Sequence, residues 1–179
     1  MATPAAEKGV VVVTGHDRRA MVREALTALG NGFQNRIREA KSIFIHPNLV
    51  NAGNQNACTH PDQVRGVLDH ISLIRPDVVK IGDAGFHNTK KAFASFDYES
   101  LKRSGNIQLI DLNDDQIIQV ASIKNTIDSG GFIQKSAAAM LGDIGFSKTV
   151  AESDFNIIVV PAKMHSYYIV SLSIKTHIV

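Results

Sequence analysis

The chain has 179 residues, the length of one ordinary domain, of which 44% are hydrophobic and 20% are charged. Its formal net charge of +2 is too small to indicate a nucleic-acid-binding protein, because such proteins concentrate basic residues in one stripe. Its one cysteine, Cys58, excludes an internal disulfide and cannot by itself hold a structural zinc ion or an iron–sulfur cluster.

The beginning of the chain and its longest apolar runs predict the compartment. Residues 1–8 are small and polar, and they lack the charged and apolar segments of a signal peptide. No apolar run approaches the roughly 18 residues that cross a bilayer. A lone cysteine suits a reducing compartment. The sequence therefore predicts a cytoplasmic protein that does not contact a membrane.

Five short apolar runs, rich in β-branched residues and bounded by Gly, Pro, Asn or Asp, recur along the chain. Such continuous runs are typical of strands that are buried on both faces of a parallel sheet. They cover residues 10–13, 43–45, 78–81, 107–110 and 157–160.

Helical periods lie between these runs. The first spans residues 22–29, with Asp17 as its N-cap and residues 30–32 as its stop signal. The second spans residues 64–71, with Thr59 as its cap and Pro61 in its first turn. A weaker period over residues 93–101 predicts a helix that breaks near Asp97. This alternation predicts right-handed βαβ units and one α/β domain over residues 1–179, a three-layer, Rossmann-like, mostly parallel sheet with helices on both faces.

The last third of the chain is less regular. Residues 117–120 predict a short strand, residues 129–131 a turn and residues 135–141 a short helix. Residues 168–179 alternate between apolar and polar side chains, as a half-buried strand does, and then stop without a turn. We therefore expect the chain to be a fragment of a longer domain.

Polar residues follow the ends of all five predicted strands. In an open parallel sheet, ligands bind beyond the carboxyl ends of the strands, so these residues predict one polar rim. Four of the seven histidines belong to it: His16, His46, His87 and His165. Caps and turns account for the same residue types, since Asp, Asn and Gly are turn formers.

Three sharper hypotheses about the rim stay open. A metal site would suit imidazole and carboxylate ligands, but the sequence has no His-x-x-x-His spacing, so we assign no metal ligands. The Gly82–Gly85 loop before Thr89 could hold an anion with its backbone amides, although it matches no phosphate-binding fingerprint. Cys58 beside His60 is better explained as an incidental loop thiol than as a nucleophile.

As an ordered set, these loops resemble a known family. The sequence is similar to the domain-of-unknown-function family 362 (DUF362) over about Ser42 to Lys175. The similarity rests on Pro47-Asn48-Leu49-Val50, Thr59-His60-Pro61, Gly82-Asp83, Asp111-Leu112-Asn113, Asp154, Pro161, Lys163-Met164-His165 and Ser171-Leu172-Ser173-Ile174-Lys175.

The chain also departs from the family pattern. His46 stands where the family usually has Lys before Pro-Asn, and Thr176 stands where it usually has Asn after Lys. Family members typically continue with further strands, and many carry a cysteine-rich, ferredoxin-like segment that this sequence lacks. The resemblance implies a fold and a set of residues but no settled activity, and it names no cofactor.

The resemblance and the rim lead to one functional prediction with two rivals. The prediction is a domain that binds or acts on a small anionic molecule, in which Lys163 and Lys175 hold the charge and His165 or His60 moves a proton. The matching residues from the other loops are Asn48, Thr59 and Asp83. The first rival is a non-catalytic module that docks an iron–sulfur or redox partner through an apolar patch with Phe132 or Phe146. The second rival is a metal enzyme that uses the histidines of the rim. Homo-oligomerisation is left open.

Overall fold

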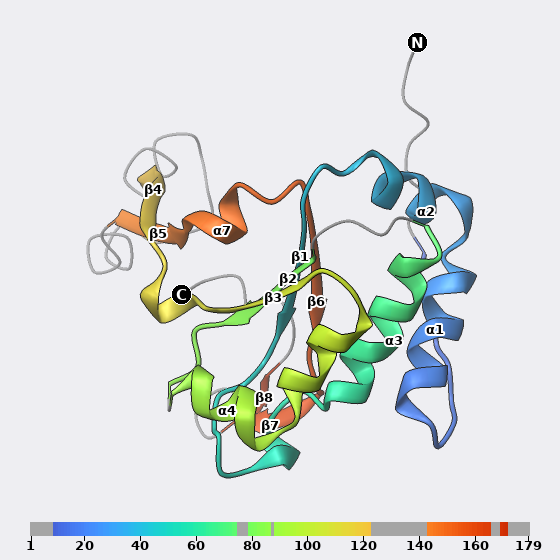
Figure 1. Ribbon diagram of the computed structural model, residues 1–179, viewed down its shortest axis with the longest axis horizontal. Helices are drawn as coiled ribbons and strands as arrows, with labels where there is room; N and C mark the ends of the chain where they lie inside the picture. The colour runs from blue at the N-terminus through green and yellow to red at the C-terminus, as the bar shows by residue number, and fades with distance from the viewer. Residues whose placement is uncertain (1–8, 75–78, 87, 123–142, 166–168, 172–179) are drawn as a thin grey trace.

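A four-stranded parallel sheet forms the centre of the molecule (Figure 1). The computed structural model describes residues 9–74, 79–86, 88–122, 143–165 and 169–171. In spatial order, the strands are β3 (Ile107–Asp111), β2 (Val79–Asp83), β1 (Ile43–Pro47) and β6 (Phe155–Val159). All three strand pairings are parallel, as the sequence predicts. The chain is thus α/β and Rossmann-like.

Most helices cover one face of this sheet. They are α3 (Pro61–Ser72), which joins β1 to β2, and α4 (Thr89–Ser95) with the 3-10 helix η2 (Tyr98–Ser104), which join β2 to β3. Side chains of these helices pack with Ile43, Ile45 and Ile81 in the main hydrophobic core. As predicted, the chain breaks at Asp97, which adopts a left-handed conformation between α4 and η2.

A shorter segment covers the opposite face. The single-turn helix α7 (Lys148–Ala151) lies on the other side of the strands from α3 (Figure 1). There Val150 packs with Phe44 and Leu112 in a second, smaller core. Leu112 begins the 3-10 helix η3 (Leu112–Asp114). The antiparallel pair β4 (Ile117–Ser122) and β5 (Asp143–Ser147) precedes α7, and β4 confirms the strand predicted over residues 117–120.

The order of the strands creates a switch point between β1 and β6. From β1 the chain moves outward to β2 and β3 over the face that carries α3. It then returns over the face that carries α7 and places β6 on the other side of β1. In doubly wound sheets, a crevice opens beyond the carboxyl ends of the two strands that flank such a point. The residues after β1 and β6 therefore occupy the position where a ligand is expected.

Two further helices precede β1. Helix α1 (Arg18–Ala28) packs along α3, and α2 (Gly30–Glu39) leads from it to β1 (Figure 1). The contact between α1 and α3 is close because α3 has Gly66 there, where a Cβ atom would lie 2.7 Å from the carbonyl oxygen of Arg19. Arg19 also donates two hydrogen bonds, of 2.6 and 2.7 Å, to the carboxylate of Asp69 on α3.

This ion pair makes a small, pH-dependent contribution to stability. The hydrogen bond from Arg19 lowers the pKa of Asp69 below its usual 3.8. A carboxyl group whose pKa is lower in the folded chain adds stability above its unfolded pKa and loses it as the pH falls through the folded value. We expect Asp69→Asn to lower the free energy of unfolding at pH 7 by about 0.5 kcal/mol, because solvent screens the pair. Urea unfolding at pH 7 and pH 3 measures this, and an equal loss at both pH values would contradict the assignment.

The structure corrects two local predictions and confirms a third. Residues 10–13 do not form a strand: they lie outside the four-stranded sheet, and Val10 is 92% exposed. The stop signal predicted after residue 29 is confirmed: α1 ends at Ala28, and Gly30, with a φ of 73°, begins α2, a helix that the sequence did not predict. His60, not Thr59, is the N-cap of α3, although Pro61 does occupy its first turn.

Some predicted features fall outside the described residues. The predicted helix over residues 135–141 and the turn over residues 129–131 are among them, as is most of the predicted C-terminal strand. Of that strand, the structure describes β8 (Ile169–Ser171), which pairs antiparallel with β7 (Lys163–His165). Within the part of the chain that is described, no helix is long and apolar enough to cross a bilayer.

Candidate functional site

The side chain of Lys163 reaches across the switch point to the loop that follows β1. Its Nζ donates a 2.7 Å hydrogen bond to Asn48 Oδ1 and another of 2.7 Å to the carbonyl oxygen of Ala57. Ala57 ends the 3-10 helix η1 (Gln55–Ala57) in the same loop. Both acceptors are uncharged oxygens, and these two bonds orient the ammonium group. The site thus places a half-buried ammonium group at the carboxyl edge of the sheet.

Thr59 fastens this loop to the strands. Its hydroxyl accepts a 2.8 Å hydrogen bond from the backbone amide of Asn48 and donates one of 2.6 Å to the carbonyl oxygen of Val159, at the end of β6. Thr59 is fully buried, and Tyr98 Oη donates to its carbonyl oxygen at 2.9 Å. The hydroxyl therefore ties the ends of β1 and β6 to the start of α3.

Asp83, at the end of β2, also fastens the loop that follows β1. Its carboxylate accepts hydrogen bonds from the amide of Leu49 at 2.5 Å, from the amide of Ala84 at 2.9 Å and from His46 Nε2 at 3.2 Å. The loop can lie this close to Leu49 because residue 85 is glycine: a Cβ atom there would lie 2.6 Å from the carbonyl oxygen of Leu49. Asp83 thereby sets the path of the chain at Asn48 and Leu49.

His60 begins α3 one residue after Thr59. Its Nδ1 accepts a 3.2 Å hydrogen bond from the amide of Asp62, and its own amide donates to the side chain of Gln63 in a reciprocal capping box. An acceptor at Nδ1 places the ring proton of a neutral imidazole on Nε2. The side chain is 34% exposed, so solvent reaches the ring.

The predicted residues are therefore brought together in part. Asn48, Thr59 and Lys163 form one hydrogen-bonded cluster, which we call the strand-end cluster, and Asp83 and His60 adjoin it through Leu49 and Thr59. His165 lies in β7, where it pairs with Ile169, and its side chain is not described. Lys175 lies outside the described residues. The functional roles of all these residues remain predictions.

Two of the four histidines that were predicted to form the rim, His16 and His46, do not belong to it. His16 precedes α1 and follows no strand, because residues 10–13 do not form one. His46 is in β1 and is only 1% exposed, since its ring turns inward to Asp83 and packs edge-on against Phe44. His87 is outside the described residues. The described residues contain no group of three or more His, Cys, Asp or Glu side chains that could hold a metal ion.

The glycine loop after β2 does not offer its amides to an anion. The amide of Ala84 donates to Asp83, and the amide of Gly85 donates to the hydroxyl of Thr89. Both donors are thus satisfied within the loop, and the anion-binding hypothesis for residues 82–85 fails for these two groups.

Cys58 is a structural thiol in this arrangement. It is 3% exposed, and its Sγ donates to the carbonyl oxygen of Asn51 at 3.3 Å. Burial raises the pKa of the thiol, an effect that the nearby Lys163 only partly offsets. A raised pKa disfavours the thiolate, which is the nucleophilic form.

Two contributors to the site have no signal in the sequence. The carbonyl oxygen of Ala57 binds Lys163, but a main-chain acceptor carries no residue signature. Tyr98 lies 39 residues from Thr59 in the chain, and only the packing of η2 against α3 brings its hydroxyl there.

Comparison with known proteins identifies the family. A family model described as "Domain of unknown function (DUF362)" matches residues 43–179, more than half of the chain. No curated protein and no solved structure matches the sequence. The match confirms the resemblance noted above.

Proposed function

This chain belongs to the DUF362 family, and we propose that it binds, or acts on, a small anionic molecule at the carboxyl edge of its sheet. The observation that carries the proposal is the placement of the Lys163 ammonium group between Asn48 Oδ1 and the carbonyl oxygen of Ala57. These contacts hold a cation at the switch point, where the doubly wound topology favours a ligand.

The strand-end cluster offers an anion more than one donor. Because Asn48 uses its side-chain oxygen as the acceptor for Lys163, its Nδ2 group faces away from that bond and makes no hydrogen bond within the described residues. An ammonium group and an amide N–H on the same loop suit a carboxylate or phosphate oxygen, since hydrogen bonds to a charged acceptor are roughly twice as strong as neutral ones.

His60 is the proposed proton donor or acceptor next to the cluster. Its Nδ1 is engaged in capping α3, so Nε2 is the atom that would exchange a proton with the ligand. Lys175 and His165 remain in the proposal through the family resemblance. Docking of a redox partner and self-association likewise stay predictions. Of the two phenylalanines named for the docking patch, Phe146 is half-buried and Phe132 lies outside the described residues.

Titration with simple anions tests the proposal. Inorganic phosphate and oxalate are added to the protein in separate experiments, and binding is followed by amide chemical shifts and by calorimetry. We expect saturable binding that Lys163→Met weakens about tenfold, since one charge-assisted hydrogen bond to an anion contributes on the order of 1–2 kcal/mol.

A matched lysine variant makes the result specific. Lys102→Met removes the same charge from an exposed position in η2, where the ammonium group contacts only Glu99 among the described residues. Its affinity for both anions should equal that of the parent protein. Saturable binding that Lys163→Met leaves unchanged would contradict the proposal, as would the absence of binding by either anion.

A further inference from the structure

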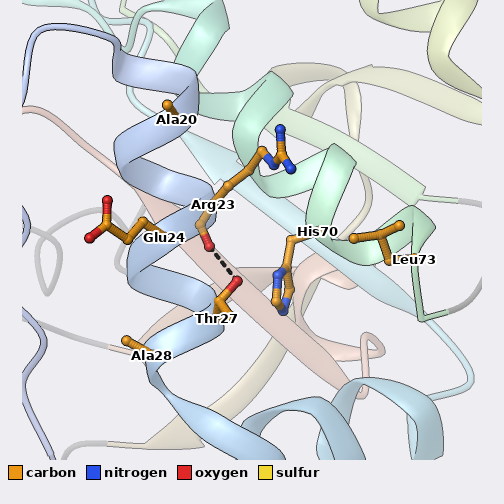
Figure 2. A pocket seen from close by; sticks show the side chains of 7 residues that line it. All are labelled: Ala20, Arg23, Glu24, Thr27, Ala28, His70 and Leu73. Carbon is orange, nitrogen blue, oxygen red and sulfur yellow. Dashed lines mark hydrogen bonds between the residues drawn. The ribbon is translucent and has the colours of Figure 1, made fainter.

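An open cavity lies between α1 and α3, away from the strand-end cluster. It has a volume of about 510 Å³, within the usual range of small-molecule pockets, and residues of both helices line it (Figure 2). On α3 its lining residues are His70 and Leu73, whereas His60 begins the same helix at the site described above. The ten-residue separation corresponds to roughly 15 Å along the helix axis.

His70 is a buried polar group with unused hydrogen-bonding capacity. Only 5% of the residue is exposed, and its Nε2 has no hydrogen-bond partner among the residues that the structure places. Burial lowers the pKa of His70 below its usual 6.5, and the charge of Arg23 lowers it further, so the ring is neutral at pH 7. A buried polar group without a partner costs about 1–3 kcal/mol.

Arg23 brings a positive charge to the same cavity. Figure 2 shows its side chain extending from α1 toward α3, while the carboxylate of Glu24 points away from α3. Arg19, one turn earlier, is held by Asp69, but the guanidinium group of Arg23 forms no hydrogen bond or salt bridge with the described residues. Its five donors are therefore available to a planar acceptor.

The remaining walls are mainly apolar. Ala20 and Ala28 of α1 and Leu73 of α3 line the cavity, and Leu73 is 80% exposed. Thr27 adds little polarity, because its hydroxyl donates to the carbonyl oxygen of Arg23 at 2.8 Å (Figure 2). A mainly apolar cavity with a few polar groups in its walls is typical of a site for a small amphipathic molecule.

We propose that this cavity binds a small carboxylic acid with an aliphatic or aromatic body. The carboxylate pairs with the guanidinium group of Arg23 and accepts a hydrogen bond from the neutral imidazole of His70. The apolar body covers Leu73 and the two alanines. This site is separate from the strand-end cluster and needs neither Lys163 nor Asn48.

Hexanoate is the probe for this site, with hexanamide as its uncharged counterpart. We expect hexanoate to shift the amide resonances of α1 and of the second half of α3 in a saturable way. Arg23→Gln should weaken its binding about tenfold, because the bidentate ion pair is lost. Hexanamide should bind as weakly to the parent protein as hexanoate does to this variant.

Two controls separate this site from other effects. Arg38→Gln removes an exposed arginine of α2, which donates a 2.8 Å hydrogen bond to Asn35, and should not change the affinity for hexanoate. Lys163→Met should not change it either, which keeps a failure here distinct from a failure at the strand-end cluster. The proposal is overturned if hexanoate gives no saturable shifts at α1 and α3, if hexanamide binds equally well, or if Arg23→Gln binds hexanoate like the parent.

Discussion

Replacing Asp83 by alanine is expected to lower the free energy of unfolding by about 4 kcal/mol, because a buried hydrogen-bonded carboxylate is lost and its partners are left unsatisfied. The amides of Leu49 and Ala84 and the ring of His46 all donate to this carboxylate. His46 is 1% exposed, so water cannot easily replace the lost acceptor. Chemical denaturation followed by circular dichroism measures the change.

The matched control for this variant is Asp114→Ala, which removes an exposed carboxylate from the neighbouring loop. Asp114 pairs with Lys90 at the surface, where both side chains are more than 60% exposed, so its loss should leave stability almost unchanged. Asp83→Asn should recover only part of the loss, since its amide nitrogen would face a backbone donor. If Asp83→Ala and Asp114→Ala were equally stable, Asp83 would not organise the strand ends.

Replacing Thr59 by valine should cost about 2 kcal/mol and should also weaken anion binding. Valine has the shape of threonine, so the change removes the hydroxyl with little effect on packing. The amide of Asn48 and the carbonyl oxygen of Val159 then lose their partner inside the protein. Because Asn48 helps to position the ammonium group of Lys163, the affinity for phosphate should fall together with stability.

Thr59→Ser is the informative comparison, because it keeps the hydroxyl and removes only a methyl group. It should retain the affinity for phosphate, with a smaller loss of stability than the valine variant. Thr27→Val controls for the valine side chain at an exposed hydroxyl of α1, where we expect little effect. Equal affinity for phosphate in Thr59→Val and in the parent protein would show that Thr59 stabilises the fold without shaping the site.

The predictions from sequence were reliable where the signal is local. The apolar runs after Ser42 correctly predicted four strands, and the left-handed residue Asp97 lies where the weak helical period breaks. The same reasoning failed at residues 10–13, whose composition is as β-prone as that of β1. A strand also needs a neighbour to pair with, and composition does not report whether packing brings one alongside.

Helix caps show a similar limit. Both Thr59 and His60 stand before Pro61, and threonine is the commoner cap. In the folded chain the hydroxyl of Thr59 is instead engaged between Asn48 and Val159, so His60 takes the capping position. A contact between segments far apart in the chain, from Thr59 to Val159, thus determined which residue caps α3.

The sequence by itself determined the order of strands and helices from Ile43 to Asp111, the parallel α/β class and the polar character of the loops after the strands, because hydrophobic period and turn chemistry are local properties. Only the tertiary structure decided that β6 lies beside β1, which brings Lys163 to Asn48 across 115 residues of chain. It also turned His46 inward to Asp83 and gave Lys163 a main-chain acceptor at Ala57. Strand pairing and main-chain contacts depend on which surfaces remain unpaired after packing, and a single sequence carries no record of that.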